Sequence, residues 1–362
     1  MASAVRTGVI APTNPGGAIR EDLINFITTI AREETPFYSS IGSTTASNVI
    51  HEWLTDDLAT PVDNAHNEGA AYAAGNVVFN TRVRKNNYCQ IFRKELGVSG
   101  TAEMTDQAGV GAGEYAYQLK KNAQELKRDI ERQFVRFQGT GAPAQTVRNG
   151  ADPRRAGSIF TWTDTIYRAP AAGNIAPVPL SGTAGTNLTF TNSVATPSDD
   201  DINGTNLFRG TLTPVNITRG HIEGILAAMY EKGAKPNMAM TSPVLKTGLS
   251  QLFSDANAST GAQRRMTSME MKLNIAVTAV MTDFGFDLAL VPNYQMGGGA
   301  LSAGYDNAVL FYESDKVNKA VLRPFQEKQL DDQGDGRRGI LICEETLEVR
   351  NPKAVGSLVG VM

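Results

Sequence analysis

The sequence predicts an α+β fold, and three stretches of unusual length carry that prediction. Residues 114–138 place apolar side chains at steps of three and four, the spacing of one face of a long helix. Residues 339–352 alternate apolar and polar side chains from Leu341 to Val349, interrupted at Glu345, as a strand with one packed and one wet face would. Two more strand-like runs, 47–55 and 77–96, lie before the helix. We therefore expect a long helix packed against long strands.

The N-terminal 47 residues predict an arm followed by a short helix. Residues 1–17 are rich in Gly, Pro and Thr, and residues 19–30 place Ile, Leu and Phe on one helical face. The strands at 47–55 and 77–96 then enclose residues 56–76, which are polar and small without a core-forming pattern. A structureless loop of that length usually contacts a partner. We expect a long hairpin with little to pack on in its own chain.

The helix at 114–138 has two faces. Leu119, Leu126, Ile130, Phe134 and Phe137 share the apolar face, and the opposite face carries four cations: Lys121, Arg128, Arg132 and Arg136. Within the helix, Glu125–Arg128 and Lys127–Glu131 have the spacing of neighbouring ion pairs. The basic face is open to two interpretations, a solvated surface or a surface turned toward a polyanion.

The rest of the chain predicts irregular β-structure and then a compact unit. Residues 140–216 are rich in Gly, Thr, Asn and Pro, with short apolar islands. From Thr218, which can cap a helix, the pattern becomes regular. Expected elements are a helix to Gly233, a strand at 238–241, a helix from Pro243, a strand–turn–strand at 274–293 and strands at 307–313 and 319–324.

Composition excludes several classes of protein. A net charge of −3 lacks the basic excess of a dedicated nucleic-acid reader. Two cysteines, Cys89 and Cys343, are too few for a disulfide scaffold and favour a reducing compartment. Neither an export signal nor a membrane-spanning stretch is expected. We expect a protein made and used in a cytoplasm, without a membrane partner.

Catalytic motifs are incomplete. His221 and Glu223 match the H-x-E of zinc deaminases, but no P-C-x-x-C follows, and a surface position at the start of a helix is the simpler interpretation. Asp199 and Asp201 open an EF-hand-like pattern whose twelfth position is Gly210 instead of Glu. We expect no enzyme, no metal and no cofactor. The alternative kept open is a metal-dependent enzyme using Asp199, Asp201 and His221.

The order of elements resembles the Hong Kong 97-type capsid fold: an arm, a long hairpin, a long helix, a compact domain and a long returning strand. Four stretches resemble the major capsid proteins of tailed phages, in the podophage-like branch often labelled as a family of unknown function. They are AREETPFYSSIGS (31–43), TPVNITRGHIEGILAAMYEKGAKP (213–236), TDFGFDLALVPN (282–293) and EETLEVRNPKAVGSL (344–358). Residues 140–216 depart from the family core.

The resemblance implies a division of the chain. Residues 1–47 would form an N-terminal arm and a short helix, and residues 48–98 an extended hairpin loop. Residues 99–139 would form a peripheral domain with the spine helix, followed by a peripheral β region with an insertion at 140–217. Residues 218–325 would form an axial α/β domain, and residues 326–362 would return to the peripheral domain with the long C-terminal strand.

The resemblance also implies a function. The chain would be a structural subunit that forms pentamers and hexamers in an icosahedral phage head, located in the virion and assembled in the host bacterial cytoplasm. Implied partners are packaged double-stranded DNA bound without sequence preference, a separate scaffolding protein, a portal and a candidate decoration protein. An encapsulin-type compartment shell is the alternative within the same fold.

Candidate sites follow from these assignments. Genome-facing residues would be Lys121, Arg128, Arg132 and Arg136. Inter-subunit loop residues would be Asp56, Asp57, Asp63, His66, Glu68 and Tyr72. Residues near the capsomer axis would be Tyr294, Gln295, Met296 and Tyr305.

Overall fold

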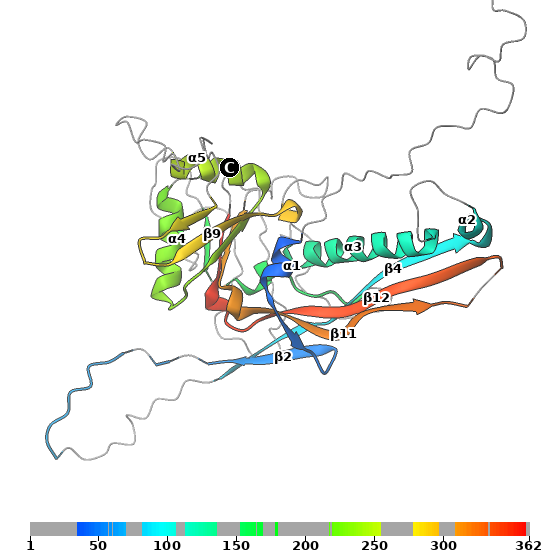
Figure 1. Ribbon diagram of the computed structural model, residues 1–362. Helices are drawn as coiled ribbons and strands as arrows, with labels where there is room; N and C mark the ends of the chain where they lie inside the picture. The colour runs from blue at the N-terminus through cyan, green and yellow to red at the C-terminus, as the bar shows by residue number, and fades with distance from the viewer. Residues whose placement is uncertain are drawn as a thin grey trace, which may run out of the picture.

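The computed structural model describes residues 35–56, 58–59, 61–69, 82–105, 113–135, 153–163, 165–168, 178–179, 217, 219–254, 278–296, 308–331 and 334–359. Within them the strands form a four-stranded sheet, a seven-stranded sheet and a two-stranded hairpin. Figure 1 shows the four-stranded sheet extending from the body that holds the seven-stranded sheet, and the hairpin projecting separately.

The four-stranded sheet has the order β1-β11-β12-β4 (Gly42–Thr45, Val317–Gln329, Gly336–Val349 and Gln90–Ser99). Strand β12 is antiparallel to both β11 and β4. The long helix α3 (Glu114–Val135) lies along one face of this sheet (Figure 1). Its apolar face buries Leu126, Ile130 and Phe134 in the cluster that also holds Phe92 of β4 and Leu341 of β12. The expected long helix on long strands is confirmed.

Ion pairs add to this helix–sheet packing. The amino group of Lys94 on β4 lies 3.0 Å from Asp129 and 3.6 Å from Glu125, both on α3. The hydrogen bond to Asp129 raises the pKa of Lys94, and burial acts in the opposite direction. Because all three side chains are partly exposed, the pairs contribute modestly next to apolar burial. Helix α2 (Gly100–Met104) connects β4 to α3, and the Ser99 side chain caps it by accepting from the Ala102 amide.

Strand β12 corrects the expectation of a wet second face. Leu341, Cys343, Leu347 and Val349 are buried as predicted, but Glu344 and Glu348 on the other face are buried too. The guanidinium groups of Arg154 and Arg323 pair with Glu344, and a hairpin covers Glu348. Both Arg154 and the hairpin come from segments far away in sequence, so alternation along one strand could not reveal that this face is covered.

The run at 77–96 forms two strands instead of one. Strand β3 (Val83–Tyr88) pairs only with β2 (Ile50–Thr55), whereas β4 begins at Gln90 and pairs with β12. Cys89 separates them, and its amide donates to the Val49 carbonyl. The chain therefore passes directly from the hairpin into the four-stranded sheet, and Cys89 alone separates the two strands.

The seven-stranded sheet has the order β6-β5-β13-β10-β7-β9-β8. Its strands are Val178–Pro179, Thr165–Arg168, Val355–Val359, Ala308–Tyr312, Met238–Thr241, Asp287–Pro292 and Ala279–Met281. Helices α4 (Arg219–Glu231) and α5 (Pro243–Ser254) pack on one face, where Ile225, Met229 and Leu249 are buried. The expected end of α4 before Gly233, the start of α5 at Pro243 and the Asp-Phe-Gly turn are confirmed, with Gly233 and Gly285 both at positive φ. The cap expected at Thr218 lies outside the described residues.

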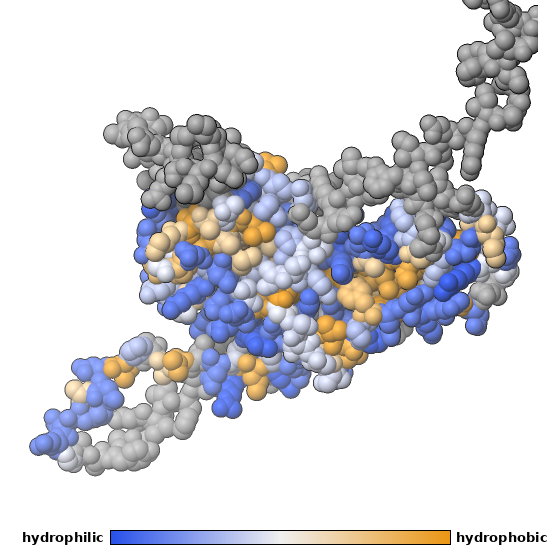
Figure 2. Space-filling model, viewed as in Figure 1, coloured by the Kyte–Doolittle hydropathy of each residue, from blue (hydrophilic) through white to orange (hydrophobic). Residues whose placement is uncertain are grey.

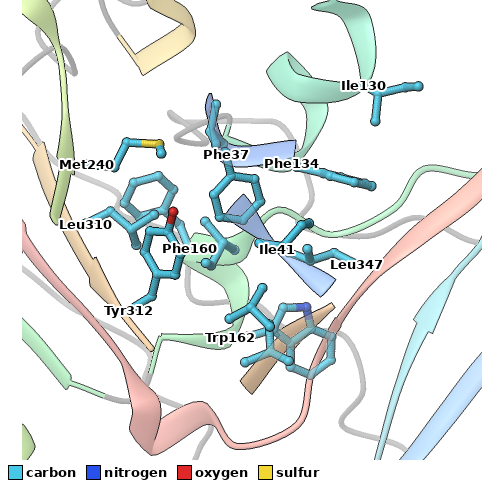
Figure 3. Close-up of a cluster of buried hydrophobic side chains, with 14 of the residues drawn as sticks. Phe37, Ile41, Ile130, Phe134, Phe160, Trp162, Met240, Leu310, Tyr312 and Leu347 are labelled. Atoms are coloured by element: carbon cyan, nitrogen blue, oxygen red, sulfur yellow. The ribbon is translucent and has the colours of Figure 1, made fainter. Parts of the chain in front are cut away.

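The other face of this sheet joins the core of the four-stranded part. Phe37 lies at the centre of that cluster, between Phe134 of α3 and Tyr312 of β10 (Figure 3). The Phe37 and Tyr312 rings meet edge to face, with centroids 5.4 Å apart. Phe37 belongs to α1 (Pro36–Ser40), a helix that the sequence did not indicate. The helix expected at 19–30 lies outside the described residues.

Short helices join the remaining segments. They are η2 (Ile159–Trp162), η3 (Tyr294–Met296), η4 (Ser314–Lys316) and η5 (Pro352–Ala354). Through η4 and η5, β10 continues into β11 and β12 into β13, so the chain crosses between the two sheets at each of these short helices. The boundary expected at residue 325 falls inside β11, and the last strand, β13, belongs to the seven-stranded sheet.

Candidate functional site: surfaces for assembly

The β2–β3 hairpin presents an acidic and apolar tip. Its strands pair from Ile50–Tyr88 to Thr55–Val83. Beyond them the exposed fractions of Leu58 and Val62 are 98% and 77%, far above what apolar side chains show in a packed domain. Figure 2 shows this segment standing clear of the body, with hydrophobic residues among hydrophilic ones. An isolated two-stranded hairpin is marginally stable, so this tip is suited to burial against another molecule.

Four of the six predicted loop residues lie on the described part of this tip. Asp56, Asp63, His66 and Glu68 are exposed, and Asp57 and Tyr72 lie outside the described residues. Asp56 is 3.4 Å from the Arg82 guanidinium across the base of the loop, and His66 Nε2 is 2.7 Å from Asn64 Oδ1. Residues 56–81 contain four carboxylates and no Lys or Arg, so the tip is negatively charged.

The base of the hairpin is fixed to β12. His51 Nε2 lies 2.9 Å from Glu348 Oε2, and Asn87 Nδ2 donates to the Leu347 carbonyl at 2.8 Å. Burial alone would raise the pKa of Glu348, but hydrogen bonds from His51 and Arg350 outweigh it and hold that pKa below its ordinary value. A rigid base therefore carries a tip that has few contacts of its own.

A second surface is the open half of the four-stranded sheet, on the side opposite α3. Pairing between β4 and β12 places Ile91, Arg93 and Glu95 on this side, because their neighbours Phe92 and Leu96 are buried under α3. Ile91 is 46% exposed, and Arg93 and Glu95 are more exposed still. The facing members from β12 and β11 are Ile340, Ile342, Arg338 and Lys328. Sequence analysis missed this surface, although the polar alternation of β4 is a signal that could have found it.

The basic face of α3 is only partly as expected. Lys121 and Arg132 are exposed and form no ion pair with any described residue. Arg128 is half-buried, and its Nε is enclosed without a hydrogen-bond partner among the described residues. Arg136 lies outside them. The expected Lys127–Glu131 pair is wrong, because Glu131 turns into the core.

The residues expected near the capsomer axis differ in their exposure. Tyr294 is 37% exposed, whereas Gln295 and Met296 are half-buried and Met296 packs on the core cluster beneath α3. The Gln295 amide donates to Asn293 Oδ1, which fixes this turn to the end of β9. Tyr305 lies outside the described residues.

The metal-dependent enzyme alternative can be compared with the described part of the chain. That part holds no group of three or more His, Cys, Asp or Glu side chains placed to bind a metal. His221 is buried within α4, which lowers its pKa, so the expected surface position is wrong for this residue. Asp199 and Asp201 lie outside the described residues. Among the described helices, none combines the length and apolar character needed to cross a bilayer.

The fold is that of the Hong Kong 97-type capsid proteins. The chain is similar to a cyanophage A-1(L) capsid structure with a TM-score of 0.62, at 11% identity and 97% and 99% coverage of the two chains. It is also similar to the capsid of a native GTA particle, with a TM-score of 0.58, 12% identity and coverage of 98% and 99%. The expected fold is confirmed.

The particular family follows from the sequence comparisons. The family model of the SU10 major capsid protein matches residues 6–362, and the chain belongs to that family. It is also 26% identical over 345 residues to the major capsid protein of Escherichia phage Phieco32, covering 92% of each. The chain is therefore a phage major capsid protein, a structural subunit of the shell. These comparisons do not favour the encapsulin or metal-enzyme alternatives.

Proposed function

We propose that this subunit builds pentamers and hexamers in which the β2–β3 hairpin of one copy lies on the open half of the four-stranded sheet of its neighbour, and that the closed shell encloses double-stranded DNA. The observation that carries the proposal is the tip itself, where Leu58 and Val62 are exposed beside acidic side chains. Covering such apolar groups is favourable, and a neighbouring molecule can do so.

The open sheet face complements this tip. It offers apolar Ile91, Ile340 and Ile342 among three cations, Arg93, Lys328 and Arg338. Glu95 on the same face pairs with Arg93 at 2.9 Å, so these cations outnumber the acid and the face is positively charged. Apolar contact supplies affinity, and opposite charge at the rim selects the register and suppresses wrong partners. The hairpin is fixed to the same side of β12 as the open face. Each copy in a ring can therefore lay its hairpin on the sheet of the next copy while all copies keep the same side facing outward.

The genome would lie on the opposite side, against α3. Lys121 and Arg132 project from the exposed face of that helix, away from the side on which the hairpin base is attached. Exposed cations of this kind suit phosphate contacts, which carry no sequence information. Arg128 and Arg136 remain candidates for the same role.

The remaining assignments follow the family plan. The division into arm, hairpin loop, peripheral domain, insertion region and axial domain stays a proposal, with β11 assigned to the peripheral sheet because it pairs with β12. Tyr294, Gln295, Met296 and Tyr305 stay candidates for the capsomer axis. We expect assembly in the host cytoplasm with a separate scaffolding protein, a portal and a candidate decoration protein, and no catalytic activity.

Charge reversal tests the proposed contact. Asp63→Lys with Glu68→Lys should leave a folded subunit that does not form rings, and Arg93→Glu with Lys328→Glu should do the same, because like charges then face each other. All four side chains are exposed, so folding is not at risk. Combining both pairs should restore rings in native mass spectrometry.

The matched control reverses Lys120 and Lys121, two exposed cations on the α3 side. Rings should form normally in that variant. Normal assembly of either single-sided reversal, or no recovery in the combined variant, would overturn the proposed contact between the hairpin and the sheet.

A further inference from the structure

Tyr38 in α1 is held by two carboxyl groups that reach it from different elements. Glu131 of α3 accepts the Phe37 amide on Oε1 at 2.9 Å and the Tyr38 amide on Oε2 at 2.7 Å. Glu345 of β12 accepts the Tyr38 hydroxyl on Oε2 at 3.2 Å. The backbone and the phenol of one residue are thus bound to two separate acids.

The first acid, Glu131, is fully buried and surrounded by neutral donors. A third donor, Asn293 Nδ2 at the end of β9, lies 2.5 Å from Oε1. Burial raises the pKa of Glu131, while the bonds from Tyr38, Phe37 and Asn293 act to lower it. This carboxyl joins α1, α3 and the seven-stranded sheet without the help of a cation among the described residues.

The second acid, Glu345, is poorly accommodated in its charged form. It is 1% exposed, and its Oε1 has no hydrogen-bond partner among the described residues. The nearest cation, Lys319, lies 3.6 Å above the Tyr38 ring and donates to the Tyr38 carbonyl at 3.3 Å. Burial raises the pKa of Glu345 to about 7, although the Tyr38 hydrogen bond and the Lys319 charge oppose that shift.

The helices and strands packed around Glu131 and Glu345 each place a side chain near these two acids. Titratable or charged side chains that act on the site are Tyr38 from α1, Lys319 from β11, Cys343 from β12, Tyr312 from β10 and Lys127 from α3, which acts on Lys319. Strand β4 places the uncharged Gln90 beside Glu345. Among the described residues, Lys319 is therefore the cation that acts on Glu345, and it is itself half-buried.

We propose that Glu131 and Glu345 form a proton-dependent latch on α1, which binds the start of the described fold to α3 and β12 and opens more often as the pH rises. Helix α1 is the first described element of the chain, so the latch controls how firmly this end of the described fold is attached to the rest. Through Asn293 the same latch reaches the seven-stranded sheet, so its opening also loosens a joint between the two sheets.

The direction of the pH effect follows from proton binding. In the closed latch Glu345 keeps its proton up to about pH 7, whereas a solvated Glu loses it near its ordinary pKa of 4.5. Between these values the closed state binds more protons than the open state, so raising the pH favours opening. Above both pKa values Glu345 is ionised in the closed and the open state, so a further rise in pH does not change the opening equilibrium. Each pKa unit corresponds to a tenfold change in the equilibrium, so opening should be more than tenfold more frequent at pH 8 than at pH 5.

Hydrogen exchange of the full-length protein tests the latch, because the Phe37 and Tyr38 amides donate directly to Glu131. After correction for the intrinsic pH dependence of exchange, their protection should fall more than tenfold from pH 5 to pH 8. Glu345→Gln removes the Glu345 proton and should reduce this fall in protection, and the pH dependence that remains belongs to Glu131, whose pKa burial also raises. Tyr38→Phe removes one bond to the charged form of Glu345, which raises the pKa of that carboxyl in the closed latch, so the fall in protection should extend to higher pH.

Glu348→Gln is the matched control, since Glu348 is a buried acid on the opposite face of β12 and its hydrogen bonds go to His51 and Arg350 instead of α1. That variant should show the same pH dependence as the wild-type chain. Protection of Phe37 and Tyr38 that does not change between pH 5 and pH 8 would overturn the proposal. An unchanged dependence in Glu345→Gln would overturn the role of Glu345.

Discussion

His51 Nε2 lies 2.9 Å from Glu348 Oε2, and this contact joins the β2–β3 hairpin to the longest strand of the four-stranded sheet. Both side chains are nearly buried. Together with the Asn87 side chain, which bonds to the Leu347 carbonyl and the Gly157 amide, it determines the direction in which the hairpin leaves the body. A hairpin that must reach a neighbour needs such a base. A hairpin on a flexible base would lose conformational entropy on binding the neighbour, which would weaken the contact.

Replacing Glu348 with Gln should weaken the base measurably. Hydrogen bonds to charged groups contribute about 1–3 kcal/mol, so urea unfolding at pH 7 should show a loss of that order. The pKa of Glu348 is below its ordinary value, so its contribution is present above about pH 4.5 and is lost as the pH falls through the folded-state value. The difference between wild type and Glu348→Gln should therefore shrink as the pH falls below 4.5 and through the lower folded-state pKa. A difference that is the same in strong acid and at neutral pH would contradict this assignment.

Leu126 tests the packing of α3 against the sheet. It is 1% exposed and belongs to the main core cluster. Leu126→Ala should lower the free energy of unfolding by about 2–5 kcal/mol, and Leu126→Asp should prevent folding by burying an unpaired charge. Lys127→Ala, on the exposed side of the same turn, should cost little. A soluble Leu126→Asp protein that assembles normally would disprove the packing.

Much of the fold could be predicted from the sequence because it depends on local periodicity. The apolar stripe of α3, the alternation of β12, the glycine that ends α4 and the turn between β8 and β9 all depend on residues within a few positions of one another. Each of these patterns indicates one kind of local structure without information from distant residues. The family resemblance then supplied the order in which these elements pack.

What could not be predicted depends on distant partners. Glu131 has helical spacing to Lys127 and was expected to pair with it, but its oxygens bind residues 93 and 94 positions away. Glu344 and Glu348 have the pattern of one wet face, but Arg154 and the hairpin cover them. The open sheet face with Ile91 is a mixed case. The alternation of β4 indicates one exposed side, but the residues that β12 and β11 add to that side appear only after the register of the three strands is known.

The exposed cations of α3 should govern how strongly DNA binding depends on salt. Lys121→Gln with Arg132→Gln should reduce the slope of log affinity against log salt concentration by about 0.9 for each phosphate that these side chains no longer neutralise. Arg93→Gln with Lys328→Gln removes the same charge from the opposite side of the sheet and should leave the slope unchanged. Equal reductions in both variants would mean that net charge alone is responsible, and the assignment of α3 to the genome side would fail.

We propose that the hairpin tip is buried against a neighbouring copy and not against its own subunit. Removing residues 58–74 tests it most directly, since this segment includes the exposed Leu58 and Val62 and lies beyond the last strand pair at Thr55 and Val83. Thermal unfolding should match that of the wild-type chain, while electron microscopy should show closed shells for the wild type and none for the shortened chain. Shells of normal number and size from the shortened chain, or unfolding comparable to Leu126→Ala, would contradict the account.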